Sequence, residues 1–175
     1  MKRISKITMC GMMAALSATF MLISYFPYLT YAIPAISGLF IMTVVVEIDR
    51  KWALLAFFAS CVPIFLLAEP ESKLLYILFF GYYPILKAKI ETLRSPVTEW
   101  AIKYSVFNVV ILFVYIIFAG ILDISFEDFG ALGKFGAVIL LILANIVFFV
   151  YDIAVSRMAM VYIKVVQPKI KKLLL

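Results

Sequence analysis

Two asparagines are the uncharged polar side chains best placed for chemistry in this sequence. Asn108 lies ten residues after Thr98, about 15 Å along its expected helix. Asn145 lies ten residues after Phe135, at about the same 15 Å depth from the other end of its run. Both amides could point into one cavity and offer paired donors and acceptors to a neutral heterocycle. Alternatively, they hydrogen-bond to each other and join two helices, a contact worth about 0.6 kcal/mol in a membrane.

An acidic residue also lies deep inside an apolar run. Asp152 follows Asn145 by seven residues and should share its helix face. A lone carboxylate surrounded by lipid must pair with a cation or take up a proton. Three basic residues fall on the same side of the membrane in the topology given below, namely Lys87, Lys103 and Arg157. The sequence therefore predicts a buried ion pair of Asp152 with Lys87 or Arg157, with a proton relay as the alternative.

Aromatic residues, 16% of the chain, supply the remaining candidates for a binding site. Several of them cluster near the predicted outer boundary of the membrane, from Tyr25 to Tyr31. They are typical of an aromatic belt, or they form a lid whose rings stack on a flat ligand. The tyrosines that could line the mouth of such a site are Tyr28, Tyr31, Tyr76 and Tyr115.

Several kinds of chemistry are excluded by the residues the chain lacks. There is no His, so no Cys–His or Ser–His pair can form, and no P-loop or H-E-x-x-H motif occurs. The two cysteines, Cys10 and Cys61, lie in apolar runs and are interpreted as space-filling. We therefore expect no enzyme, no metal and no cofactor. The basic residues near each end of the chain suit anionic lipid better than nucleic acid.

The composition shows which solvent must surround these residues. Of the 175 residues, 66% are hydrophobic and 15% are charged, with a mean hydropathy of +1.13. Such a chain cannot cover a water-exposed surface with polar groups, so we predict an all-α integral membrane protein with a single domain over residues 1–175. Six apolar runs predict a six-transmembrane-helix bundle, with spans at 7–28, 31–46, 52–68, 74–86, 104–122 and 135–163.

The distribution of charge predicts the orientation of these spans. Six spans with cytoplasmic N- and C-termini place 14 of the 16 Lys and Arg residues on the cytoplasmic side, leaving Lys73 and Lys134 outside. The second and fourth spans are short and contain Pro34 and Pro84, so each is either a full span or a re-entrant helix. In "YPILKAKIE", residues 83–91, the helix is expected to leave the membrane with Lys87 and Lys89 among the anionic headgroups, as a topology anchor or a docking surface.

Small residues form a pattern in the first predicted span. In "CGMMAALSATF", Gly11, Ala14, Ala15 and Ala18 recur at spacings of three and four. Small residues let two helix backbones approach closely in lipid. The stripe therefore predicts either packing against another helix of the same chain or docking of an external membrane partner.

The chain resembles the S components of energy-coupling factor transporters, the small six-span subunits that bind vitamins and other micronutrients. The resemblance covers the length, the basic start, Ala14-x-x-x-Ala18, and the aromatic segment "SYFPYLTYAIPAISG". It implies that the first helix, through Ala14 and Ala18, packs on a transmembrane coupling protein driven by two ATPase subunits, and that the first external loop caps the substrate. It further implies a multi-pass protein of a bacterial cell membrane that takes up a small, largely uncharged molecule.

A second class of protein is also compatible with these features. The chain resembles the small polytopic rod-shape-determining membrane proteins, which act as scaffolds and transport nothing. A transport subunit predicts an occluded cavity under the first outer loop, containing Asn108, Asn145 and aromatic rings. A scaffold predicts a filled interior and a partner-binding surface.

Overall fold

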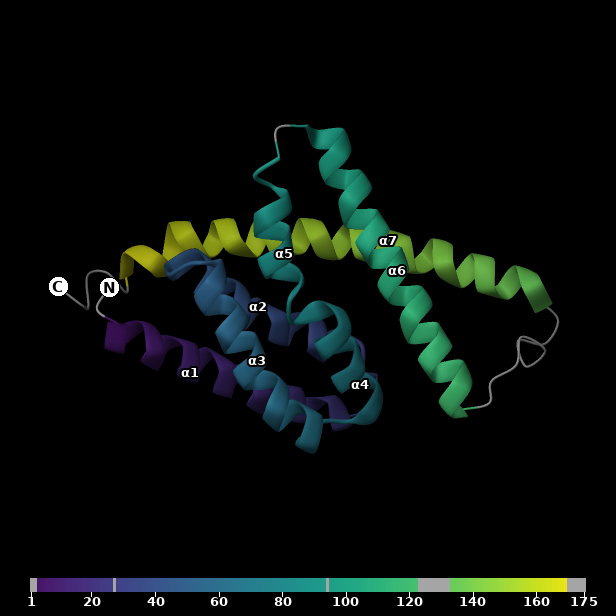
Figure 1. The fold of residues 1–175 in the computed structure, drawn as a ribbon, viewed down its shortest axis with the longest axis horizontal. Helices are drawn as coiled ribbons and strands as arrows, with labels where there is room; N and C mark the ends of the chain where they lie inside the picture. Colours follow the sequence, from purple (N-terminus) through teal and green to yellow (C-terminus); the bar gives the residue numbers. More distant parts are fainter. Residues whose placement is uncertain (1–2, 27, 94, 123–132, 170–175) are drawn as a thin grey trace.

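A computed structural model describes residues 3–26, 28–93, 95–122 and 133–169, and the regular elements in these ranges are helical without exception (Figure 1). In chain order they are α1 (Arg3–Met21), η1 (Leu22–Tyr25), α2 (Ala32–Glu47), α3 (Arg50–Leu67), α4 (Pro70–Leu75), η2 (Tyr76–Phe80), α5 (Tyr83–Ile90), α6 (Pro96–Leu122), α7 (Gly133–Val161) and η4 (Tyr162–Val166). The predicted all-helical class is therefore observed throughout the described ranges.

Within the described ranges, four helical segments are long and apolar enough to cross a membrane. They are Arg3–Tyr25, Arg50–Leu67, Pro96–Val114 and Val138–Lys169, and Ala32–Glu47 is a shorter apolar helix. The fourth predicted span, 74–86, is not one regular helix, because it is divided among α4, the π-helical turn η2 and α5. The molecule is thus compatible with a membrane location.

Side-chain caps fix the short connections around α3 and α4. Asp49 precedes α3, and its Oδ1 accepts hydrogen bonds from the backbone N–H groups of Lys51 and Trp52 at 2.8 and 3.0 Å. Glu69 caps α4 in the same way, through Ser72 N–H at 2.9 Å. Each cap satisfies donors that the first helical turn leaves unpaired. The chain can therefore reverse direction within a few residues at both points.

The break between η2 and α5 follows from a close approach of side chains. A Cβ atom on Gly81 would lie 2.6 Å from the Phe57 ring and 2.8 Å from the Tyr76 ring, so glycine is required there. Pro84 then stands in the first turn of α5, where its missing N–H leaves no hydrogen bond unmade. The segment can restart as a helix after the break without losing a backbone bond.

Two clusters of buried side chains hold the helices together. The first joins α1, α2, α3 and η2, with Met21, Ile41 and Tyr76 fully buried. The second is aromatic and joins η2, α5, α6 and α7 through Phe79, Tyr83, Phe107 and Phe148. The rings of Phe107 and Phe148 are stacked with centroids 4.3 Å apart. The two clusters meet at η2, which α2 and α6 both contact.

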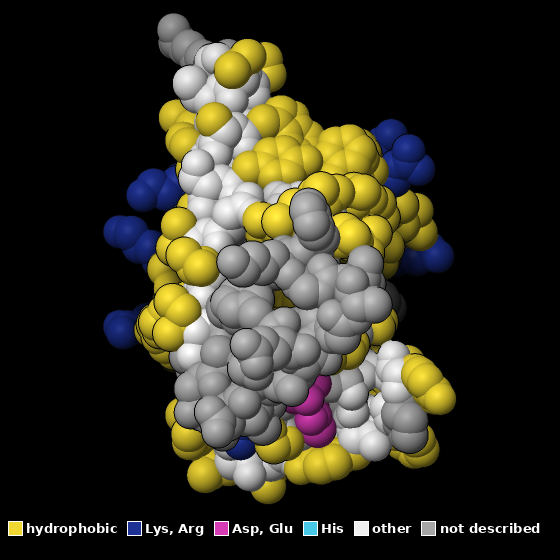
Figure 2. Space-filling view, turned by 90° about the vertical axis from the view of Figure 1, so that its right-hand side faces the viewer, with side chains coloured by type: hydrophobic (Ala, Val, Ile, Leu, Met, Phe, Trp, Pro, Cys, Tyr) yellow, Lys and Arg dark blue, Asp and Glu magenta, His cyan; other side chains and the backbone are white. Residues whose placement is uncertain are grey.

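The outer surface of the described residues is largely apolar. Figure 2 shows hydrophobic side chains over much of the described part of one face, with Lys and Arg mostly toward its two sides. On α7 the successive residues Ile142 and Leu143 are 55% and 52% exposed. Water would be a poor solvent for such a surface, whereas lipid suits it.

Candidate functional site

The candidate site is a cluster of buried charges where α5, α6 and α7 meet. Lys87 of α5, Lys103 of α6 and Asp152 of α7 are 3%, 1% and 3% exposed. Charged side chains are rarely buried to this extent unless they are paired. The aromatic cluster described above places them together, because Tyr83 lies one helical turn before Lys87 and Phe148 one turn before Asp152.

The Asp152 carboxylate is the centre of this cluster. Its Oδ1 accepts hydrogen bonds from Lys87 Nζ and from the Tyr83 hydroxyl, the latter at 2.5 Å, and its Oδ2 lies 3.2 Å from Lys103 Nζ. Both oxygens are therefore satisfied by donors from α5 and α6. Lys87, one of the two predicted partners, is therefore paired with Asp152. The alternative, a proton relay, would require Asp152 to take up a proton although its carboxylate already contacts two ammonium groups.

Two further carboxylates connect the cluster to its exposed edge. Lys87 Nζ lies 2.9 Å from Glu91 Oε1, and Lys103 Nζ lies 2.6 Å from Glu99 Oε1, each pair four residues apart along the chain. Lys103 Nζ also lies 3.4 Å from Glu91 Oε1. The side chains of Glu91 and Glu99 are 42% and 21% exposed. Three carboxylates thus face two ammonium groups, an arrangement suited to tying three helices together.

The structure differs from the sequence-based expectations about these charges in two respects. Arg157 lies exposed on α7 and forms no ion pair with Asp152 within the described part of the chain, because five residues along a helix turn it well away from that face. Lys87 does not reach toward headgroups but points into the protein, whereas Lys89 is exposed. Only one of the two lysines in "YPILKAKIE" is therefore free to serve as an anchor.

The two asparagines are hydrogen-bonded to each other. Asn108 Nδ2 donates to Asn145 Oδ1 and Asn145 Nδ2 donates to Asn108 Oδ1, both at 3.0 Å. Asn108 Nδ2 also donates to the Tyr104 carbonyl of its own helix, and Asn145 Nδ2 donates to the Leu141 carbonyl of its own helix, both at 2.8 Å. All four amide hydrogens are used, so the pair joins α6 to α7 and offers no free donor to a ligand in this conformation.

Beside this pair lies an open groove of about 550 Å³ on the surface of α6 and α7. It is lined by Tyr104, Leu141, Ile142, Asn145, Ile146 and Phe149. The groove faces outward, so it differs from the occluded cavity that a transport subunit was expected to build around these amides.

A layer of buried hydroxyl groups lies elsewhere, among α1, α2, α3 and η2. The Tyr76 hydroxyl is 2.8 Å from Ser17 Oγ and 2.9 Å from Ser60 Oγ, and Ser17 Oγ is 3.1 Å from the Ser37 carbonyl oxygen. These four residues have no exposed surface. Within the described structure, the hydroxyls of Ser37 in this layer and of Ser24, a buried serine of η1, have no hydrogen-bond partner. Unpaired buried hydroxyls cost about 1 to 3 kcal/mol each, which makes this layer unusual.

The segment between η1 and α2 is fastened to the start of α4 and the end of α3. Ser72 Oγ donates to the Thr30 carbonyl at 2.8 Å, the Tyr31 hydroxyl to Glu71 Oε2 at 3.1 Å, and the Tyr25 hydroxyl to the Leu67 carbonyl at 3.0 Å. These three bonds hold the segment against α3 and α4. Partial burial, and then the Glu71 carboxylate, raise the pKa of the Tyr31 phenol above its ordinary value, which keeps it a hydrogen-bond donor.

Of the four tyrosines expected to line one mouth, the three whose side chains the structure describes are not brought together. Tyr28 is 98% exposed and has a left-handed backbone with φ of 70°, which is uncommon for a residue other than glycine. Tyr31 is exposed beside it, whereas Tyr76 is fully buried in the hydroxyl layer instead of lining an opening. The side chain of Tyr115 lies outside the described residues.

The stripe of small residues on α1 divides between two faces. Ala14 is 5% exposed and Ala18 packs against the core, so both serve the contacts of α1 with its own chain. Gly11 and Ala15 are exposed, and nothing lies within 4 Å of where a Gly11 Cβ would be. Internal packing thus accounts for Ala14 and Ala18, and the face available to another helix is the one with Gly11 and Ala15.

Sequence reasoning missed most of the polar partners in these sites. The spacing of four residues in Lys87–Glu91 and in Glu99–Lys103 was a visible signal of helical ion pairs. The serines of the hydroxyl layer gave no comparable signal, since single serines are common in membrane helices. Within the described ranges, no cluster of three or more His, Cys, Asp or Glu residues could hold a metal ion.

Comparison with known proteins supplies no relative from which a function could be transferred. No protein-family model matches the chain, and neither curated proteins nor solved structures show a significant match to it.

Proposed function

We propose that this chain is the substrate-binding membrane subunit of a micronutrient or vitamin uptake transporter, a six-span protein with both termini in the cytoplasm. The observation that carries the proposal is the buried hydroxyl layer with its unpaired Ser37, together with the unpaired buried hydroxyl of Ser24 in η1. A cavity for a neutral polar molecule needs such groups, buried from lipid and free to exchange hydrogen bonds with a ligand.

The chemistry of the layer indicates the class of substrate. Its groups are uncharged hydroxyls and one backbone carbonyl, contributed by Ser17, Ser37, Ser60 and Tyr76. Hydroxyls both donate and accept, so they suit a small uncharged ligand with several polar atoms. The Tyr76 ring fills the layer in this structure, so a ligand must displace it or its hydrogen bonds.

The fastened segment between η1 and α2 supports an entry route from the outside. Ser24 lies in η1 directly before this segment, and Ser37 lies six residues after Tyr31, about 9 Å along α2. The bonds Ser72–Thr30 and Tyr31–Glu71 hold the segment over that region. Their loss would cost little, since single hydrogen bonds contribute about 0.5 to 1.5 kcal/mol. The segment can therefore open to admit a ligand.

The exposed face of α1 supports a partner in the membrane. Thr8, Gly11, Ala15 and Thr19 follow one another at spacings of three and four, and all four are exposed. Such a smooth face lets a second helix approach closely, and packing drives helix association in lipid. The sequence has no P-loop, so the energy for uptake would come from ATPase subunits acting through the helix docked here.

Ligand-dependent stability tests the proposal. Purified protein is heated in detergent with each member of a panel of uncharged vitamins, and a ligand that binds the folded state raises the melting temperature. We expect one compound to do so for the wild type, and expect Ser24→Ala and Ser37→Ala to lose this shift while melting normally without ligand. Ser156→Ala, a serine on α7 outside the layer, is the matched control and should keep the shift. A shift unaffected by both substitutions would contradict the proposed site.

A non-transporting scaffold is the second candidate, and the closed Asn108–Asn145 pair favours it. Both amides are fully bonded within the protein, and the rings around them are stacked, which is what a filled interior requires. Ala15→Trp blocks the outward face of α1 whether the chain is a transport subunit or a scaffold. Ala59→Trp, on the exposed face of α3, is the control. A partner lost with Ala15→Trp but no ligand response in any assay would favour the scaffold.

A further inference from the structure

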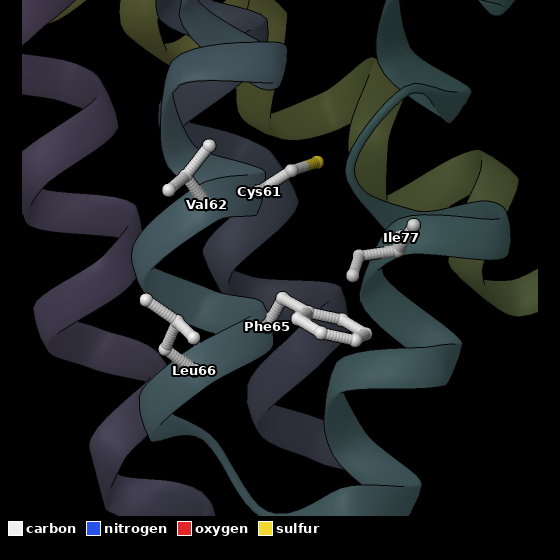
Figure 3. A pocket seen from close by; sticks show the side chains of 5 residues that line it. All are labelled: Cys61, Val62, Phe65, Leu66 and Ile77. Atoms are coloured by element: carbon white, nitrogen blue, oxygen red, sulfur yellow. The ribbon is translucent and has the colours of Figure 1, made fainter.

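A narrow apolar groove of about 340 Å³ runs along α3 beside η2. It is lined by Cys61, Val62, Phe65, Leu66 and Ile77. Figure 3 shows the side chains of Cys61 and Phe65 pointing from α3 toward Ile77. The groove belongs neither to the charge cluster nor to the hydroxyl layer.

The lining side chains decide what kind of apolar group can enter the groove. Val62, Phe65, Leu66 and Ile77 are bulky and would hold the backbone of a neighbouring helix at a distance, unlike the small residues that favour helix docking in membranes. The four α3 residues span only about 7.5 Å of the helix axis, or about one and a half helical turns, so an apposed helix would have a short surface to pack against. A flexible hydrocarbon chain fits such a short groove with bulky walls better than a helix.

A lysine provides a positive charge at the groove. Lys73 lies four residues before Ile77 on the continuous helical segment of α4 and η2, and its Nζ lies 5.2 Å from the centre of the Phe65 ring. The same Nζ donates to the Phe65 carbonyl at 3.4 Å. Among the described residues no carboxylate lies within 4.0 Å of it.

The two acids nearest to Lys73 in sequence are directed to other partners. Glu69 Oε2 accepts from the backbone N–H of Ser72, and Glu71 Oε2 accepts from the Tyr31 hydroxyl. An ammonium group has three hydrogens, and only one is directed at the protein. Lys73 is therefore available to an anion at the membrane surface.

We propose that this groove binds one anionic phospholipid, with an acyl chain against Phe65 and Ile77 and the headgroup phosphate on Lys73. The acyl chain matches the apolar groove, and the headgroup phosphate matches the cation at its border. Phosphatidylglycerol fits this description, and a zwitterionic lipid gains less from Lys73 because its own ammonium group competes for the phosphate.

The test uses the full chain in nanodiscs with equal amounts of phosphatidylglycerol and phosphatidylethanolamine. Lipids that stay bound after transfer to detergent are counted by native mass spectrometry for the wild type, Lys73→Gln, Ile77→Trp and the control Lys51→Gln, an exposed lysine at the start of α3. We expect Lys73→Gln to lower retention of phosphatidylglycerol about fivefold, as the loss of one membrane-surface lysine should. Ile77→Trp fills the groove and should reduce retention of both lipids, while Lys51→Gln should change neither.

Cross-linking places the lipid independently of any substitution. A phosphatidylglycerol with a diazirine in its acyl chain should label the peptide that contains Cys61, Phe65 and Leu66. Equal retention by Lys73→Gln and Lys51→Gln, or labelling confined to other helices, would overturn the proposal. So would an Ile77→Trp variant that keeps its lipid but loses a co-purifying membrane protein, because a partner helix would then be the occupant. Lipid retention and vitamin-dependent stability are separate readouts, so either proposal can fail without the other.

Discussion

Removing the Asp152 carboxylate should destabilise the contact among α5, α6 and α7. Asp152→Ala leaves Lys87 and Lys103, which are 3% and 1% exposed, without the carboxylate that they share. Breaking a buried ion pair on one side costs about 3 to 5 kcal/mol, mostly because a buried charge is left without compensation. We expect a value near the lower end, about 3 kcal/mol, because each lysine keeps a second carboxylate.

The carboxylates that remain beside the two lysines limit how much stability Asp152→Ala can lose. Lys87 keeps Glu91 at 2.9 Å and Lys103 keeps Glu99 at 2.6 Å, but these side chains are 42% and 21% exposed and hold the lysines less firmly. Asp152→Asn retains an acceptor oxygen and loses the charge, so it should cost about 1.5 to 3 kcal/mol, the value of a charged hydrogen bond. For a chain of this length, 3 kcal/mol corresponds to a fall in melting temperature of roughly 6 to 12 °C.

A thiol-reactive fluorescent dye measures this fall in detergent. Cys10 is 7% exposed in the folded protein, so its reaction reports unfolding, and the partly exposed Cys61 sets the baseline. Glu91→Gln is the control and should cost less than about 1 kcal/mol, as exposed ion pairs do. If Asp152→Ala melts within about 2 °C of the wild type, or no lower than Glu91→Gln, the cluster does not tie the three helices together.

Two further predictions concern close packing and the amide pair. Gly38→Ala should destabilise the protein by about 1 to 3 kcal/mol, because its Cβ would lie 2.3 Å from the Phe80 carbonyl oxygen, whereas Gly11→Ala, facing open space, should be neutral or stabilising in the same thermal assay. In a double-mutant cycle of Asn108→Leu and Asn145→Leu, the coupling should be about 0.6 kcal/mol, and a coupling near zero would show that the pair does not join α6 to α7.

The helical segments could be predicted because the apolar runs that define them are local. The fourth segment could not, because its division at η2 depends on contacts made by other helices. Gly81 has to lie against the rings of Phe57 and Tyr76, and Phe57 comes from α3. Sequence periodicity contains no information about such a contact.

The need of Asp152 for a basic partner could be predicted from the sequence, but the identity of that partner could not. A buried carboxylate at Asp152 must pair, and three basic residues were near enough in the expected topology. Helix rotation and tilt selected among them, turning Lys87 and Lys103 inward and Arg157 outward. The buried face of α1 could not be predicted either. Neighbouring alanines there differ by about 100° around the helix axis, so that Ala14 is buried while Ala15 is exposed.

The most direct test of the proposed function is a search for small molecules bound to the protein as it leaves the membrane. The chain is purified in mild detergent from cells grown in rich medium, denatured, and its released small molecules are identified by mass spectrometry beside a matched Ser37→Ala sample. A substrate-binding subunit should release one uncharged micronutrient from the wild type and far less of it from Ser37→Ala. Identical small molecules from both samples, or none from either, would contradict a binding site in the hydroxyl layer.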